Sequence, residues 1–289
     1  MVFFLCIKWY DIYSKTRSNE RNEVPLVIDI HTHIFPDKIA EDTISLLEER
    51  AHLHANTRGS MKELLTSMKR GGVGLSVVQP IATSVKNMKS INNFAAQTNS
   101  HASLLSFGSI HPQAEDWREE LKRIKELGLP GIKFHPNYQG FVASQPEIAD
   151  IVNFAAELGL IVLFHAGEDV GLPDTVSSTP ADFVKLLERT KGAKIILAHM
   201  GGWNLWNEVE QHLIGRDVYL DTSFTITRTG MEQFKRMVQN HNPDKILFGT
   251  DSPWQSQLKS VESIRACGFD SALTDAILYR NAASLLRLE

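Results

Sequence analysis

The chain is poor in cysteine and has no concentrated positive charge. Cys6 and Cys267 are its two cysteines, and no Cys-x-x-Cys pair occurs among its 289 residues. A disulfide framework and a thiolate zinc site are therefore excluded, and a reducing, cytoplasmic location fits best. The net charge is −4 with no Lys/Arg block. Nucleic acid and anionic membranes are therefore not expected as partners, which leaves a small-molecule substrate.

Long apolar runs are missing too. The run at residues 2–7 is too short to span a bilayer or to form a signal peptide with a cleavage site. We expect residues 1–23 to be a disordered N-terminal extension. With 43% hydrophobic and 22% charged residues, the remainder has the composition of a globular protein with a sizeable core. No linker or low-complexity tract divides it, so residues 24–289 are predicted to form a single domain.

Short apolar segments alternate with longer amphipathic ones from residue 24 onward. The short runs are apolar on both faces, as expected for strands of a buried parallel sheet. They lie at residues 27–30, 75–78, 104–110, 131–134, 160–164, 195–198, 218–220 and 246–248. The intervening segments are rich in Leu, Glu, Lys and Ala and are predicted to be helices. They lie at residues 39–49, 61–70, 85–97, 114–127, 147–158, 181–190, 203–213 and 231–239.

Eight strand–helix units predict an α/β fold of the (β/α)8 TIM-barrel type. A doubly wound open sheet is the competing topology, and it usually carries a glycine-rich phosphate turn after its first strand. This chain has His31-Thr32-His33 at that point. The first unit is longer than the others, which indicates an insertion.

Histidines and an aspartate follow several of the predicted strands. In a barrel the carboxyl ends of the strands meet at one mouth, so these side chains should become neighbours. Side chains alternate along a strand, so His31 and His33 share a face, as do Lys133 and His135. Imidazole and carboxylate groups are typical ligands of a divalent transition metal, most often zinc, with one position open to water. The predicted ligands are His31, His33, His165 and Asp251.

At these positions the sequence resembles the amidohydrolase superfamily, in particular its branch of aminocarboxymuconate-semialdehyde-decarboxylase-like proteins. The resemblance runs from about residue 24 to the C-terminus. It is carried by VIDIHTH at 27–33, GIKFHP at 131–136, VLFHAG at 162–167, ILAHMGG at 196–202, LDTS at 220–223, ILFGTDSP at 246–253 and NAASLL at 281–286.

The resemblance implies roles for individual residues. Asp251 would be both a metal ligand and the carboxylate that carries a proton, and His199 would orient water and substrate or bind a second ion. Lys133 could be carboxylated and bridge two ions, and His135 could be a ligand or contact the substrate. One ion is expected and a second is compatible with the pattern, although some relatives in this branch work without metal. Kinship also suggests a homodimer or a higher homo-oligomer.

The predicted reaction is hydrolysis. A metal-activated water would cleave a C–N or C–O bond of an amide, lactone or ester in a small, carboxylated substrate. The alternative is non-oxidative decarboxylation of an unsaturated or aromatic acid at the same centre. Arg58 and Arg228 are the candidates for holding a substrate carboxylate. Asp221 is expected to hydrogen-bond a ligand histidine, and Asp169 to be a charge on a surface loop.

Overall fold

The computed structural model describes residues 27–172, 175, 178–190 and 192–288. The predicted extension at residues 1–23 lies outside this part of the chain. The described strands all pair in parallel with their neighbours. They are β1 (Val27–Thr32), β2 (Val73–Val78), β3 (Leu104–Ser106), β4 (Gly108–Ser109), β5 (Gly131–Phe134), β6 (Ile161–Phe164), β7 (Ile195–Leu197), β8 (Tyr219–Asp221) and β9 (Ile246–Leu247).

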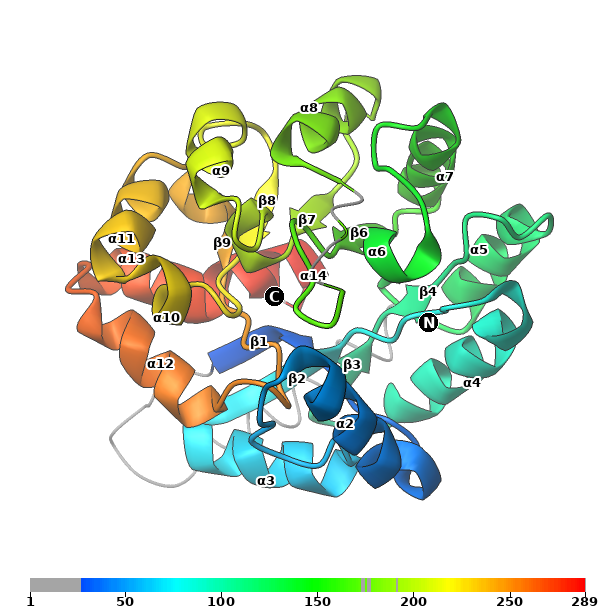
Figure 1. The fold of residues 1–289 in the computed structure, drawn as a ribbon, viewed down its shortest axis with the longest axis horizontal. Coiled ribbons are helices and arrows are strands. Elements are labelled where there is room, and N and C mark those ends of the chain that lie inside the picture. Colours follow the sequence, from blue (N-terminus) through cyan, green and yellow to red (C-terminus); the bar gives the residue numbers. More distant parts are fainter. Residues whose placement is uncertain (1–26, 173–174, 176–177, 191, 289) are drawn as a thin grey trace.

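Backbone hydrogen bonds connect the two parallel sheets, which have the strand orders β1-β2-β3 and β4 to β9. Phe107, between β3 and β4, donates its N–H to the carbonyl of Val78 at 2.9 Å. At the other junction, Ile30 of β1 donates to the carbonyl of Phe248 at 2.9 Å. Residues 104–109 thus form one interrupted strand, and eight strand positions follow one another around the ring in Figure 1. The predicted α/β barrel class is confirmed.

The helices surround these strands (Figure 1) and occupy the predicted segments with shifts of a few residues at their ends. The longer ones are α2 (Asp37–Ala51), α3 (Met61–Gly71), α4 (Met88–Thr98), α5 (Trp117–Glu126), α7 (Pro146–Glu157), α8 (Pro180–Arg189), α9 (Trp206–His212), α11 (Met231–Gln239) and α12 (Gln257–Ala266). The shorter ones are η1 (Val85–Asn87), α6 (Pro136–Gln139), η2 (His199–Gly201), α10 (Ile226–Thr229), η3 (Pro243–Lys245), α13 (Ser271–Asp275), η4 (Ala276–Arg280) and α14 (Asn281–Leu286).

Local sequence signals set the helix boundaries. The Ser60 side chain accepts the backbone N–H of Glu63 at the start of α3. Thr179 and Asp182 form a reciprocal capping box at the start of α8. Gly128 follows α5 with a φ of +75°, a left-handed conformation that glycine adopts without a Cβ clash. The first unit is long because α2 precedes α3, so the expected insertion is an additional helix.

Two hydrophobic clusters form the core. The larger lies between the strands and the surrounding helices, and it includes Leu64 and Met68 of α3. The smaller joins side chains of β1, β2, β6 and β7 to Ala282, Ala283 and Leu285 of α14. In Figure 1, α14 lies behind the strands near the centre of the ring. The last helix therefore covers one end of the barrel with apolar side chains.

Replacing Leu285 by alanine tests this role of α14. Leu285 is buried in the smaller cluster, and deletion of a buried leucine side chain destabilises a domain by about 2–5 kcal/mol. The same change at Leu258 is the matched control because that side chain is exposed on α12. In denaturant unfolding, the free energy of unfolding should fall clearly in Leu285→Ala and by less than about 1 kcal/mol in Leu258→Ala. Equal losses would contradict the assignment.

Candidate metal centre

The predicted site residues gather at the carboxyl ends of the strands. His31 belongs to β1 and His33 follows it, while Lys133 belongs to β5. His135 caps α6, directly after β5. The remaining three lie just beyond strand ends: His165 after β6, His199 at the start of η2 after β7, and Asp251 beyond β9. All seven line one cavity, as the barrel geometry predicts.

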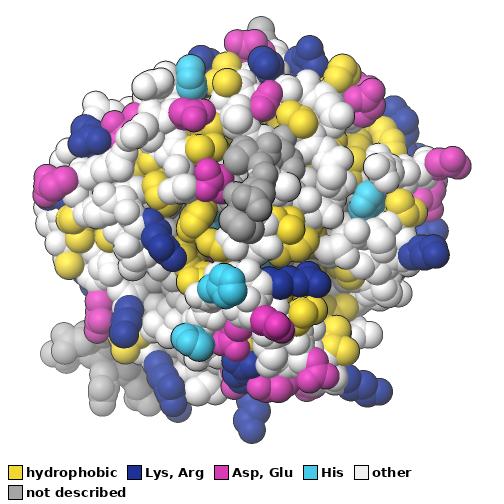
Figure 2. All heavy atoms as spheres, in the orientation of Figure 1, with side chains coloured by type: hydrophobic (Ala, Val, Ile, Leu, Met, Phe, Trp, Pro, Cys, Tyr) yellow, Lys and Arg dark blue, Asp and Glu magenta, His cyan; other side chains and the backbone are white. Residues whose placement is uncertain are grey.

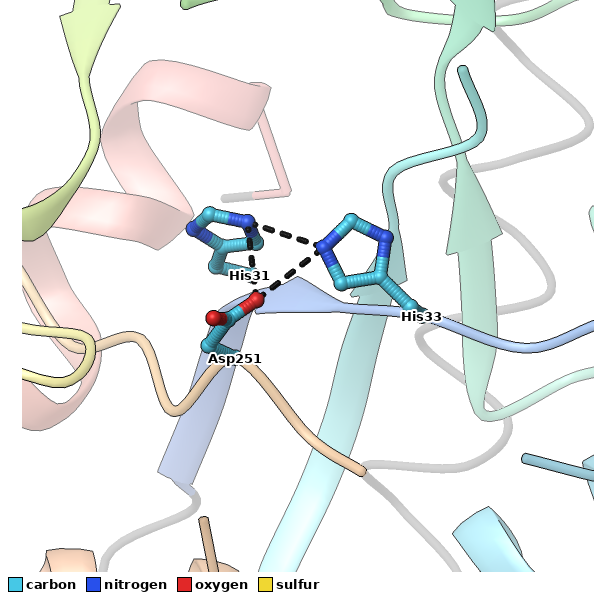
Figure 3. A group of neighbouring side chains, drawn as sticks. All are labelled: His31, His33 and Asp251. Carbon is cyan, nitrogen blue, oxygen red and sulfur yellow. Dashed lines mark hydrogen bonds and ion pairs between the residues drawn. The ribbon is translucent and has the colours of Figure 1, made fainter. Parts of the chain in front are cut away.

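His31, His33 and Asp251 form a compact group of three donors (Figure 3). The two Nε2 atoms are 3.1 Å apart. Asp251 Oδ1 lies 3.4 Å from His31 Nε2 and 3.1 Å from His33 Nε2. Ligands at about 2.1 Å from one ion, separated by angles of 90–110°, are about 3.0–3.4 Å from each other. The three separations therefore match adjacent positions around one metal ion.

The orientation of His31 is set by a buried carboxylate. Its Nδ1 donates to Asp221 Oδ2 at 2.9 Å, which leaves a lone pair on Nε2 directed at His33 and Asp251. Burial opposes ionisation of Asp221, but His31 and His199 outweigh it and hold the pKa of Asp221 well below its usual range. A carboxylate that holds a ligand histidine in one tautomer is a regular component of metal centres. The expected contact of Asp221 is confirmed.

One ring nitrogen of His165 faces one ring nitrogen of His199, and each of the two carries a lone pair. His165 Nε2 donates to the carbonyl of Glu168 at 3.1 Å, and His199 Nδ1 donates to the carbonyl of Ser223 at 3.1 Å. The remaining nitrogens, Nδ1 of His165 and Nε2 of His199, are 3.2 Å apart. Two neutral imidazoles would there direct lone pairs at each other, which is unfavourable unless a proton or a cation lies between them. The arrangement fits a metal ion.

His135 and Asp169 make a different kind of pair. His135 Nε2 lies 3.2 Å from Asp169 Oδ2, and its Nδ1 accepts the N–H of Tyr138 at 3.4 Å. Although His135, His165 and Asp169 lie close enough to be a second donor group, His135 has both nitrogens satisfied within the protein. Its ring stacks on His165 at a centroid distance of 4.0 Å. Its position fits a substrate contact better than a ligand.

Asp169 corrects the expectation of a surface charge. Its relative exposure is 9%, and its second oxygen accepts the N–H of Gly171 at 2.8 Å. The sequence places it only four residues after His165, in a segment that folds back over the site. That return could not be read from residue types, because it depends on backbone pairing of Gly167 with Trp203 in another loop.

Lys133 is a cation buried in the same cavity. Its Nζ lies 3.4 Å from His31 Nε2. Burial lowers its pKa to about 8, although Asp221 and Asp251 favour the charged form. Burial disfavours the charged form of Asp251 as well, but His31 and His33 outweigh this effect and keep its pKa well below the usual range. The site thus keeps the ionised carboxylates of Asp221 and Asp251 beside His31, whose pKa burial lowers.

Asp29 is a site residue that the sequence analysis missed. It is fully buried and accepts hydrogen bonds from the Thr250 backbone at 3.0 Å and the Thr250 hydroxyl at 2.6 Å. It also accepts the N–H of His31 at 3.2 Å. Asp29 therefore fixes the residue before Asp251 relative to His31. An acidic residue inside an apolar strand was the signal that could have revealed it.

The cavity has a volume of about 730 Å³ and opens away from these polar groups. Figure 2 shows hydrophobic side chains near the centre of the face that carries the mouth. Neither predicted carboxylate-binding arginine lines the cavity. Arg58 is paired with Glu41 and Glu48, and Arg228 packs over the rings of Trp203 and Phe224. Arg50 of α2 lines the cavity instead.

A parallel α/β barrel with a candidate metal-binding group at the carboxyl ends of its strands has the arrangement of a barrel enzyme. The sequence profile of the amidohydrolase family matches residues 28–288. The chain belongs to the amidohydrolase family. A comparison with curated protein sequences found no match.

Solved structures with the same fold include several decarboxylases. The 5-carboxyvanillate decarboxylase from Sphingomonas paucimobilis has a TM-score of 0.68 at 16% identity, over 92% of this chain and 100% of that chain. The 2,6-dihydroxybenzoate decarboxylase from Rhizobium has a TM-score of 0.70 at 16% identity, over 92% of this chain and 99% of that chain. The dihydroxybenzoic acid decarboxylase from Polaromonas sp. JS666 was solved with bound manganese and 2-nitroresorcinol. It has a TM-score of 0.71 at 16% identity, over 92% of this chain and 98% of that chain.

These comparisons correct the prediction of hydrolysis as the main reaction. The solved enzymes that share the fold over nearly the whole chain decarboxylate aromatic acids. The prediction was wrong because the same donor set is compatible with both reactions, so the residues after the strands could not decide between them. None of the helices in the described residues is long and apolar enough to cross a membrane.

Substitution of Asp221 tests the metal centre directly. Asp221→Asn keeps the shape of the side chain but weakens the hydrogen bond that orients His31, so affinity for Mn²⁺ or Zn²⁺ should fall about 10- to 100-fold. Calorimetric titration of the metal-free protein with each ion measures this. Asp244→Asn, at an exposed position, should bind both ions like the wild type. Unchanged affinity in Asp221→Asn would contradict the proposed centre.

The burial of His31 also predicts a pH dependence of stability. Burial lowers the pKa of His31 to about 4, whereas in the unfolded chain it is about 6.5. Between these values the unfolded chain binds more protons. The free energy of unfolding of the metal-free protein should thus be highest above about pH 6.5 and decrease as the pH falls toward 4.

Denaturant unfolding at a series of pH values measures this dependence. His31→Gln should reduce the slope of the curve, because it removes one titrating group while His135 and His165, whose pKa values burial also lowers, remain. His54→Gln is the control, since the side chain of His54 is fully exposed, and it should leave the curve unchanged. A wild-type curve without slope in this range would count against burial of a neutral His31.

Proposed function

We propose that this protein is a metal-dependent, non-oxidative decarboxylase of a small aromatic or unsaturated carboxylic acid. The observation that carries the proposal is the position of the donor group at the polar end of a cavity whose other walls are largely apolar. Such a cavity suits a flat, apolar molecule that has its charged group at one end. The decarboxylases that share the fold support the choice of reaction.

His31, His33 and Asp251 would hold one divalent ion, whereas His165, the fourth predicted ligand, and His199 line the same cavity but lie outside this group of mutually close donors. Zinc suits this donor set, and manganese is bound in one of the structures that share the fold. When bound, the ion would supply positive charge that holds oxygen atoms of the substrate and stabilises the negative charge that develops on them. A cytoplasmic location and a homo-oligomeric state stay predictions.

Lys133 and His135 are proposed to bind the substrate. Lys133 Nζ is a buried cation beside the donor group, and it would attract a carboxylate that has lost its water shell. The Nε2–H of His135 points at Asp169, at the border between the polar end and the mouth. These two side chains would orient the acid so that its ring extends into the apolar part of the cavity.

Decarboxylation replaces a carbon–carbon bond by a carbon–hydrogen bond and therefore needs one proton. The bond between the ring carbon and the carboxyl carbon breaks, carbon dioxide leaves, and the electron pair remains on the ring carbon, which takes a proton. Asp251 faces the histidines through Oδ1, so Oδ2 is the oxygen proposed to take a proton from water and pass it to the carbon. His199 would stabilise the oxygen atoms of the substrate that become negative as the bond breaks if it is protonated, because only then does Nε2 also carry a hydrogen.

Carbon dioxide release tests the proposal. The protein loaded with Mn²⁺ or Zn²⁺ should release carbon dioxide from one or more hydroxybenzoic acids, and a chelator should abolish the activity. Asp251→Asn should lower kcat by about 10²- to 10⁴-fold because it removes the proton carrier. Asp244→Asn should retain full activity. Cleavage of amides or lactones without carbon dioxide release would overturn the proposal.

A further inference from the structure

Helix α2 is an addition to the barrel that contributes little to its core. Of its fifteen residues, only Ala40 and Ile44 are buried. Two of its large apolar side chains are half exposed, Ile39 at 50% and Leu46 at 47%. The next helix, α3, packs Leu64 and Met68 into the core and performs the usual covering role in this unit. In Figure 1, α2 lies in front of β2 and β3, on the side of the mouth.

The apolar side chains of α2 face the cavity that contains the donor group. Ile39, Ile44, Leu46 and Leu47 line it from this helix. Across from them, the cavity is lined by Ile81 after β2 and by Ile91 and Phe94 of α4. We call the part of the cavity bounded by these seven side chains the apolar arm.

The composition of the apolar arm defines what it can hold. Its polar lining from α2, η1 and α4 consists of Thr43, Asn87, Ser90 and Arg50, and Arg50 is exposed in the last turn of α2. No carboxylate or lysine of these helices lines it. A charged group placed among the seven apolar side chains would lose its hydration without a partner. The arm therefore suits an uncharged, apolar group.

The cavity is also larger than an acid with a single ring requires. At about 730 Å³ it is in the range of sites that hold drug-sized ligands. An acid with a single ring, held by the donor group and Lys133, would leave water in the arm against apolar side chains. Replacing this water by an apolar group is favourable, because apolar surface leaves water on both sides.

We propose that the apolar arm is a substrate subsite for an uncharged apolar substituent, such as an alkyl chain or a second aryl ring. The substrate is then an aromatic or unsaturated acid with its carboxylate at the donor group and this substituent between α2 and α4. This inference rests on the proposed decarboxylase function for the orientation of the acid. Helix α2 determines specificity because it supplies more than half of the arm.

A series of substrates of increasing length tests the subsite. The metal-loaded protein is assayed with 2-hydroxybenzoic acids that carry hydrogen, ethyl, butyl or hexyl at the 4- or the 5-position. Each buried methylene should raise kcat/KM by about 4-fold until the arm is full. The double variant Leu46→Ser/Leu47→Ser should lose most of this increase, measured as the ratio of its kcat/KM values for the hexyl-substituted and the unsubstituted acid.

Leu258→Ser is the matched control. Leu258 is exposed on α12 and does not line the cavity, so this variant should retain the full dependence on chain length. A wild-type kcat/KM that does not rise with chain length would overturn the subsite. So would an equal rise in the double variant.

A binding measurement separates this inference from the proposed reaction. Calorimetric titration of the metal-loaded protein with the same acids reports affinity without turnover. Affinity that rises with chain length in the wild type and not in the double variant supports the subsite, even if no acid releases carbon dioxide. Carbon dioxide release from the unsubstituted acid, together with affinity independent of chain length, would retain the decarboxylase and overturn the subsite.

Discussion

The site depends on histidines in which one ring nitrogen, on the side away from the cavity, is hydrogen-bonded to the protein. His31, His165 and His199 each donate one ring N–H to a fixed acceptor, namely Asp221, the Glu168 carbonyl and the Ser223 carbonyl. Because one nitrogen is used in this way, the other directs its lone pair into the cavity. Burial keeps the His31 and His165 rings neutral, because it lowers the pKa of both. The converging ring nitrogens beside an ionised Asp251 thus include a group that could hold a cation.

The closure of the barrel brings the first and last ligands together. Asp29 joins β1 to Thr250, and Asp251 donates its N–H to the carbonyl of His31 at 2.8 Å. Asp251 and His199 both have positive φ values, of 59° and 57°. Such conformations are unfavourable for residues other than glycine and persist where the surrounding contacts determine them. Precise placement of two site residues thus depends on contacts formed across the whole barrel.

The donor set alone does not determine the reaction. Hydrolysis and decarboxylation can both use a metal ion, a carboxylate that carries a proton and a histidine. The choice of decarboxylation rests on the solved structures that share the fold, and the largely apolar lining of the cavity suits the ring of an aromatic acid. The proposed subsite rests on a different feature, the apolar side chains that α2 and α4 contribute to the cavity lining.

The sequence by itself determined the class of fold, the order of the strands and the residues that end them. It could do so because strand alternation, helix periodicity and caps are local, and because parallel strands must direct their carboxyl ends to one mouth. The match at His31, His33 and Asp251 follows from this rule. Only the tertiary structure decided the burial of Asp169, the role of Asp29, the pairing of Arg58 with Glu41 and Glu48, and the place of α2 beside the cavity. These features depend on contacts between loops and helices far apart in the chain, and no local pattern encodes such contacts.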